Sequence, residues 1–269
     1  MNIDEILTLY DREERRETEF PDMVKEVFPG VIRFVRAAPE MSFVLYTDLD
    51  ETTADAAIDD QLAFFLGNRQ PFEWKVFAHD RPADMVERLV ARGLQAEGPD
   101  AIMVLDLNAV PETLLRPPAA DVRRLTDPAQ LADIVTVLEP VWGESFDWVH
   151  ERLGKHMMTP GLLSVYVAYV DAAPACAGWG YDSPSQFASL WGGSTLEAYR
   201  GRGLYTALMA ARVQEAREKG RRYVTVDAGP MSKPILARHG FEVMTYATAC
   251  EYKPDGAEET AASATRDQA

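Results

Sequence analysis

Cysteine and histidine are scarce in this chain of 269 residues, and their placement argues against several kinds of site. The two cysteines, Cys176 and Cys250, form neither a C-x-x-C pair nor a disulfide framework, which suits a reducing compartment. The four histidines lack the spacing of metal ligands, so we expect no metal site. They are His79, His150, His156 and His239.

Positive charge and long apolar runs are also lacking. The chain has 27 lysines and arginines against 43 acidic residues, a net charge of −16. Nucleic-acid binding depends on clustered cations, so we expect none. No apolar run reaches membrane-spanning length, and residues Met1–Glu5 do not resemble a signal peptide. We therefore predict a cytoplasmic protein that binds no membrane, either a monomer or a homodimer.

One cationic, glycine-rich turn stands out against this acidity. It follows a strand-like run, Ala188–Leu196, and precedes a helix-like run, Leu204–Lys219. Glycines let backbone N–H groups approach a phosphate, and a helix N-terminus favours negative charge. Arg200 and Arg202 add two cations. The turn matches neither G-x-x-x-x-G-K-[ST] nor G-x-G-x-x-G, so it indicates an anion site or, alternatively, only a basic surface turn.

Two motifs in this region carry a family resemblance. The hexapeptide from Arg200 to Tyr205 resembles the [QR]-x-x-G-x-[GA] signature of the GNAT superfamily of acyl-CoA N-acyltransferases. Pro234–Phe241 resembles the helix and Gly-Phe that close that family's core. The resemblance covers about residues 120–253. It implies that the turn holds the CoA pyrophosphate and the preceding strand the pantetheine arm. The implied cofactor-binding residues are Ser194, Thr195, Leu196, Arg200, Gly201, Arg202, Gly203, Leu204, Tyr205 and Thr206.

The same resemblance implies direct transfer of an acetyl group, in a ternary complex, from acetyl-CoA as co-substrate to the amine of a small molecule. The oxyanion donor is then a main-chain N–H near Thr195–Leu196. Asp227, Glu197 and Glu144 are candidate bases, and each is alternatively a surface or capping carboxylate.

The general acid is the sharpest departure from the family pattern. Many members have a tyrosine four residues before the Gly-Phe, where this chain has Leu236. Tyr205, Tyr181, Tyr246 or water are the substitutes that we consider. Tyr205 itself replaces a small residue of the signature, and helical spacing also places it on a core stripe with three apolar residues. The stripe continues through Met209, Val213 and Ala216.

The first half of the chain repeats the order of elements in the second half. Strand and helix patterns alternate at 31–36, 42–46, 54–67, 72–78, 82–92 and 101–107, and again at 188–196, 204–219, 222–227, 232–238 and 242–252. In place of the cationic turn the first copy has Asp50–Asp55, whose acids repel a pyrophosphate. Ordinary alternation of α and β elements is the other explanation.

We therefore predict an α/β protein of α+β type with two GNAT-like modules, each a mixed, mostly antiparallel twisted sheet flanked by helices. The predicted domains are residues 1–116, a degenerate module, and 119–253, the N-acetyltransferase domain, joined near Pro117–Ala120. Residues 254–269 read as a disordered tail. A non-catalytic acyl-CoA-binding or regulatory module is the alternative function, and an interaction protein is a third.

Overall fold

The computed structural model describes residues 1–254, which form two compact units. The N-unit comprises residues 2–101 and 244–254, and the C-unit comprises residues 102–243. Both dividing points fall inside strands, β6 (Asp100–Asp106) and β12 (Glu242–Tyr252). Residues 102–116, expected in the first module, therefore pack in the C-unit, and most of β12 packs in the N-unit. Of the predicted tail, residues 255–269 lie outside the described residues.

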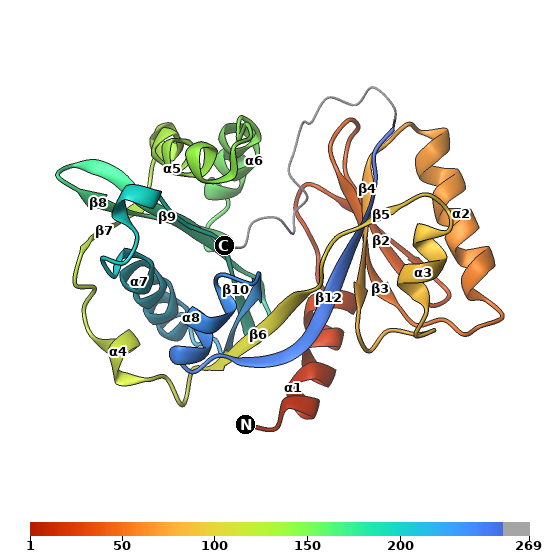
Figure 1. Cartoon of the computed structure of the whole chain (residues 1–269), viewed down its shortest axis with the longest axis horizontal. Helices are drawn as coiled ribbons and strands as arrows, with labels where there is room; N and C mark the ends of the chain where they lie inside the picture. Colours follow the sequence, from red (N-terminus) through yellow and green to blue (C-terminus); the bar gives the residue numbers. More distant parts are fainter. Residues whose placement is uncertain (255–269) are drawn as a thin grey trace. The chain divides into compact units, whose positions relative to one another are not determined.

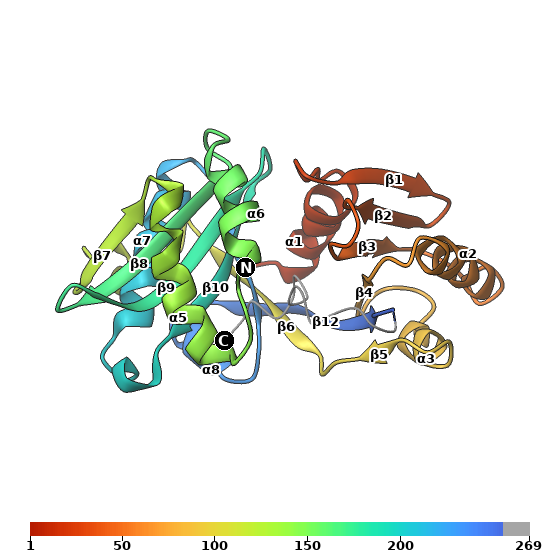
Figure 2. The ribbon, with the colours of Figure 1, turned by 90° about the horizontal axis from the view of Figure 1, so that it is seen from above.

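The C-unit is a mixed sheet with helices on both faces (Figure 1). Its strand order is β6-β11-β10-β9-β8-β7, antiparallel from β7 to β10 and parallel between β10 and β11. Helices α5 and α6 cover one face and α7 the other, as Figure 2 also shows. The strands are β7 (Asp121–Leu125), β8 (Leu163–Val170), β9 (Ala173–Asp182), β10 (Phe187–Thr195) and β11 (Tyr223–Ala228). The helices are α4 (Glu112–Leu115), η2 (Pro128–Leu131), α5 (Ala132–Trp142), α6 (Trp148–Met157), η3 (Glu197–Tyr199), α7 (Leu204–Glu218) and α8 (Lys233–Arg238).

The N-unit has the same kind of architecture. Its strand order is β1-β2-β3-β4-β12, with β5 also on β12, and β3 and β4 form its parallel pair. Helices α2 and α3 lie on one side of the sheet and α1 on the other (Figures 1 and 2). The elements are α1 (Ile3–Tyr10), a π-helix (Asp11–Arg16), β1 (Val24–Phe28), β2 (Val31–Val35), β3 (Ser42–Thr47), α2 (Ala54–Gly67), β4 (Phe72–Phe77), α3 (Met85–Val90) and β5 (Gln95–Ala96).

The predicted α/β class is confirmed, and the predicted strands and helices occur close to their expected bounds. Residues 142–153 carry apolar side chains at helical spacing and do not form one helix. Helix α5 ends at Gly143, which adopts a left-handed φ of 74°, and α6 begins at Trp148. Glycine pays little for this conformation, so it ends the helix within an otherwise periodic pattern.

Each unit has its own apolar core. In the N-unit, α2 packs on β4, with Phe65 stacked on Phe72 at 4.1 Å between ring centroids and Trp74 fully buried. In the C-unit, α5 and α6 pack on β8 and β9 around Trp179, which is 1% exposed. Both cores form where helix and strand stripes predicted from periodicity meet.

A buried arginine ties the N-terminal segment of the N-unit to its sheet. Residues 11–17 are all charged, a pattern typical of a solvated helix face, but the structure buries Arg15 completely. Its guanidinium donates to both carboxylate oxygens of Asp80, at 2.7 and 2.9 Å, and to Asp11 at 2.7 Å. It also lies 3.8 Å from the centroid of the Phe77 ring. The sequence pattern missed this arrangement because its main partner is 65 residues away.

We expect Arg15→Ala to lower the free energy of unfolding by about 3–5 kcal/mol, because it leaves Asp80 buried without its counter-charge. Urea denaturation of the full chain measures this. Arg12→Ala is the control, since Arg12 is exposed and pairs only with neighbouring Glu13, and it should cost less than about 1 kcal/mol. Equal losses in the two variants would contradict the assignment.

Candidate active site

The parallel ladder between β10 and β11 is short. It pairs Phe187 with Tyr223 and ends at Ser189 and Thr225, although β10 runs on to Thr195 and β11 to Ala228. In the described chain, the later parts of the two strands therefore have no ladder between them. The backbone groups on these inner edges are the ones that a linear ligand can use.

Strand β10 carries a bulge at the point where the ladder has ended. Its register against β9 shifts between Trp191 and Ser194, which pair with Trp179 and Ala177. The bulge places two residues of β10, Gly192 and Gly193, opposite the single residue Gly178 of β9. A Cβ on Gly192, whose φ is +62°, would lie 2.0 Å from the Trp179 ring, and one on Gly193 would lie 2.8 Å from the Tyr205 ring. Only glycine fits at either position.

Tyr205, a candidate for both cofactor binding and catalysis, therefore lies against the bulge. Its ring is half-buried at the start of α7 and packs with Tyr166 and Leu208. Burial raises the pKa of its hydroxyl, so it stays protonated at neutral pH. Position and protonation both suit a proton donor, and the residue also heads the predicted core stripe.

The N-terminus of α7 is open to an anion. Its N-cap is Gly203, in a left-handed conformation with φ 77°, and no side chain caps the helix. Gly201 has φ 73°, and Arg200 and Arg202 are exposed beside it. The Arg200 Nε donates to Thr195 O at 3.2 Å, which holds this guanidinium next to the end of β10. Uncapped N–H groups and two cations meet at one turn.

The residues predicted to bind pantetheine already form hydrogen bonds within the C-unit. Ser194 is buried, and its Oγ accepts a hydrogen bond from Trp142 Nε1 at 3.1 Å. The hydroxyl of Thr195 donates to Cys176 Sγ at 3.2 Å. The amide of Leu196 donates to Ala175 O at 3.0 Å. The Leu196 amide, expected to donate to an oxyanion or to pantetheine, is therefore already bonded to β9.

Thr206 and the candidate carboxylates occupy different places. The Thr206 Oγ1 lies 3.1 Å from His239 Nε2, which links the first turn of α7 to the end of α8. Asp227 is 6% exposed and lies on β11 beyond the last residue paired to β10. Glu197 is exposed in η3, and Glu144 is half-buried between α5 and α6. Of the three, Asp227 is the one that lies on β10 or β11 beyond the end of their ladder.

The candidate acids other than Tyr205 lie elsewhere. Leu236 is 1% exposed and packs as a core residue. The Tyr181 hydroxyl lies 2.6 Å from His156 Nδ1. Tyr181 pairs across β9 and β10 with Ser189, where β10 is still paired with β11. Tyr246 belongs to the N-unit. The sequence analysis did not include Trp142 and Trp179 among the site residues. The signal that could have indicated them is the glycine pair inside a strand pattern, which is typical of a bulge or of a close contact.

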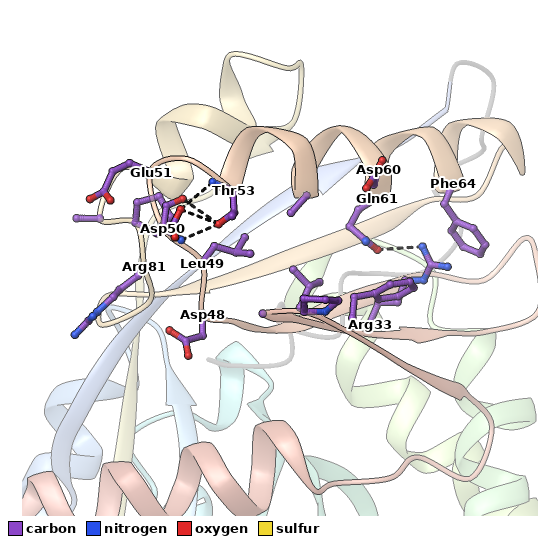
Figure 3. A pocket seen from close by; sticks show the side chains of 17 residues that line it. Arg33, Asp48, Leu49, Asp50, Glu51, Thr53, Asp60, Gln61, Phe64 and Arg81 are labelled. Carbon is purple, nitrogen blue, oxygen red and sulfur yellow. Dashed lines mark hydrogen bonds between the residues drawn. The ribbon is translucent and has the colours of Figure 1, made fainter.

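The matching turn of the N-unit is closed by its own side chain. The Asp50 carboxylate accepts hydrogen bonds from the amides of Thr52 and Thr53, at 2.8 and 2.9 Å, and from both hydroxyls (Figure 3). These bonds lower the pKa of Asp50 to about 2. A fixed carboxylate therefore uses the N–H groups that an external anion would need, in addition to the repulsion expected from the acids there.

A large pocket adjoins this turn in the N-unit. Its volume is about 1160 Å³, and Figure 3 shows its wall of loop and α2 side chains. At one end Arg33 donates to Gln61 Oε1 at 3.0 Å and lies 3.4 Å from the centroid of the Phe64 ring. The remaining charged lining is mostly acidic, and comprises Asp48, Asp50, Glu51, Asp60 and Arg81.

Residues 1–254 lack two further features. No group of three or more His, Cys, Asp or Glu side chains in this part of the chain is arranged to hold a metal ion. None of its helices combines the length and the apolarity needed to cross a bilayer.

One family model matches most of the C-unit. Residues 114–233 match the family model for the acetyltransferase (GNAT) domain. The match includes β10, its bulge, the turn and α7. No curated protein sequence matches the chain.

Several solved structures share the fold over nearly the whole chain at low identity. A GCN5-related N-acetyltransferase from Kribbella flavida is 12% identical, with a TM-score of 0.69 over 95% of this chain and 96% of that one. A functionally unknown conserved protein from Staphylococcus epidermidis is 14% identical, with a TM-score of 0.68 over 93% and 99%. A tandem GNAT protein from the clavulanic acid biosynthesis pathway is 15% identical, with a TM-score of 0.56 over 96% and 89%. At these identities the likeness establishes the GNAT fold.

We expect Asp50→Ala to lower the melting temperature at neutral pH, because the Thr52 and Thr53 amides lose their acceptor. The folded-state pKa of about 2 lies below the unfolded value of about 3.9, so the carboxylate stabilises the fold above about pH 4. This contribution is lost as the pH falls through about 2. The difference in melting temperature between wild type and variant should therefore shrink from pH 5 to pH 2.

Glu51→Ala is the matched control, because it removes an exposed acid from the same turn. Its melting temperature should follow that of the wild type at every pH. A pH-independent effect of Asp50→Ala would contradict the capping role of the carboxylate.

Proposed function

We propose that the C-unit, of which residues 114–233 match the family model for the acetyltransferase (GNAT) domain, transfers an acetyl group from acetyl-CoA to the amine of a small molecule. The observation that carries the proposal is the uncapped N-terminus of α7, which lies beside Arg200 and Arg202 and directly follows the bulged strand. In a chain with a net charge of −16, this is a site built for an anion.

The CoA pyrophosphate fits the turn from Arg200 to Thr206. The first amides of α7 donate to its oxygens, and the two guanidinium groups neutralise its charge. The pantetheine arm then extends along β10 where the ladder to β11 has ended, at Ser194 and Thr195. Since the amide of Leu196 is paired with β9, we assign that residue a packing contact rather than a hydrogen bond.

The proposed reaction is direct attack of the amine on the thioester carbonyl. A C–N bond forms, the C–S bond breaks, and the tetrahedral oxyanion is held by main-chain N–H groups of the β10 bulge. Asp227, directly or through water, takes the proton of the amine, and the exposed Glu197 is the weaker candidate. The leaving thiolate takes a proton from Tyr205 or from water.

The N-unit, by contrast, is proposed as a degenerate GNAT-like module that binds no CoA at its equivalent turn. The Asp50 carboxylate already occupies the amides there. Its own parallel ladder, between β3 and β4, also ends early, at Val44 and Trp74, so the two units share an architecture while differing in this one contact.

A non-catalytic acyl-CoA-binding module is the second candidate, and one observation favours it. The position of the family's usual acid is Leu236, buried at 1% exposure, and no hydroxyl replaces it there. Such a module would bind acetyl-CoA and release no thiol.

The first test is a calorimetric titration of the full chain with acetyl-CoA and with CoA. We expect one site per chain, because one turn is open and the other is capped by Asp50. Thiol release from acetyl-CoA with a panel of small amines then separates the two candidates. Two sites per chain would contradict the degenerate N-unit, and absence of binding would exclude both functions.

We expect Gly203→Glu to weaken acetyl-CoA binding by on the order of a hundredfold, since it places a carboxylate at the α7 N-terminus and removes about two charge-assisted hydrogen bonds. The space beside Gly203 is open, so the protein should stay folded. Gly220→Glu is a matched control at the other end of the same helix. Gly220 has φ +75°, against +77° for Gly203, and an equally open Cβ position. Binding that is equally weakened in both variants would remove the pyrophosphate assignment.

A further inference from the structure

A buried arginine lies behind the bulge and has no carboxylate partner within residues 1–254. Arg212 is on α7, is 4% exposed, and lies among core residues such as Leu208 and Val213. Its Nη1 donates to two main-chain oxygens, Trp179 O at 3.2 Å and Trp191 O at 3.1 Å. The first belongs to β9 and the second to the residue at which the β10 bulge begins.

The backbone is shaped to admit this guanidinium. Gly178 is the β9 residue opposite the bulge, and a Cβ on it would lie 2.8 Å from Arg212 Nη1 and 3.2 Å from Cζ. Any other residue at position 178 would displace the guanidinium. Three glycines thus admit three side chains at one place, Arg212 beside Gly178, Trp179 beside Gly192 and Tyr205 beside Gly193.

No carboxylate in residues 1–254 forms an ion pair with Arg212, although Asp182 and Glu215 line the same small cavity. The nearest carboxylate along α7, Glu215, accepts from Ser164 Oγ at 2.7 Å and Tyr166 OH at 3.1 Å and pairs with Lys219 at 3.3 Å. The Arg212 Nε is buried without a hydrogen-bond partner. The cavity that Arg212 lines is about 20 Å³, room for about one water molecule, and the Arg212 side chain is almost fully buried.

An uncompensated buried cation costs stability, and an apolar side chain would fill the same place more cheaply. Burial also lowers the pKa of the guanidinium, although from a value so high that the group stays charged. An arrangement that destabilises the fold and is nevertheless accommodated by a dedicated glycine points to a role in function.

We propose that Arg212 is a positioning residue for acyl transfer, which fixes the β10 bulge and directs its positive potential at the acetyl carbonyl. The inference rests on the function proposed above. Donation from a cation to Trp191 O polarises the Trp191–Gly192 peptide, which makes the amide of Gly192 a stronger donor. The buried positive charge adds to the same potential, and both effects favour the oxyanion over the neutral thioester.

The test compares Arg212→Met, Arg212→Lys and a control, Arg217→Met, which removes an exposed arginine from the last turn of the same helix. The probe is acetyl-CoA labelled with ¹³C at the carbonyl, whose infrared stretching frequency reports its polarisation when bound. Calorimetry gives the affinity for acetyl-CoA, and turnover of the best amine of the panel gives kcat and KM.

In the wild type and Arg217→Met we expect the bound carbonyl to absorb at a lower frequency than free acetyl-CoA. In Arg212→Met the shift should disappear and kcat should fall about tenfold or more, while the affinity for acetyl-CoA is retained. Arg212→Lys keeps the charge but reaches the carbonyls less well, so it should restore part of both.

A wild-type carbonyl frequency in Arg212→Met would overturn the inference and leave the proposed acetyl transfer intact. Loss of the fold in both Arg212 variants would overturn it in favour of a purely structural role. Failure of the wild-type protein to bind acetyl-CoA would be seen first, by calorimetry, and would overturn the proposed function itself.

Discussion

The C-unit depends on one local constraint, the contact between the β10 bulge and the side chains that surround it. A strand that pairs regularly on both edges has no free backbone groups to offer a ligand. In this protein the ladder to β11 ends at Ser189, and two residues later the bulge begins. The bulge persists because Trp179 and Tyr205 occupy the space that side chains at positions 192 and 193 would need. Removing either ring would leave a void, and adding either side chain would produce a clash.

The two units show how one backbone arrangement supports two different outcomes. In each, a parallel ladder ends early and a turn leads into a helix. In the C-unit the helix begins at a glycine with no side-chain cap. In the N-unit the Asp50 carboxylate accepts from two amides and two hydroxyls. The same N–H groups that would hold a phosphate in one unit are satisfied by an internal anion in the other, so the choice between binding and stability rests on a few residues at one turn.

The two units each bury an arginine, and the two arginines differ in how their charge is compensated. Arg15 pairs with Asp80 and Asp11 and joins the N-terminal segment to the N-unit sheet, so its charge is compensated. Arg212 bonds only to main-chain oxygens, so its charge is not. Burying an ion is expensive in either case, but a counter-ion returns much of the cost through Coulomb attraction. Arg15 is thus part of a structural ion pair, whereas Arg212 is a buried cation that forms no ion pair within the described residues.

The sequence by itself determined the element order, the α/β class and the position of the cationic, glycine-rich turn, because these depend on local periodicity and on glycine and arginine at fixed spacing. Tertiary structure alone decided three other features. Residues 102–116 pack in the C-unit and most of β12 packs in the N-unit, each in the unit opposite to the one predicted from its place in the sequence. Strand pairing does not depend on proximity along the chain. The amide of Leu196 is taken by Ala175, and Arg212 reaches carbonyls 21 and 33 residues away. Pattern reasoning sees which residues share a face of one element, whereas hydrogen-bond partners and burial depend on which faces meet.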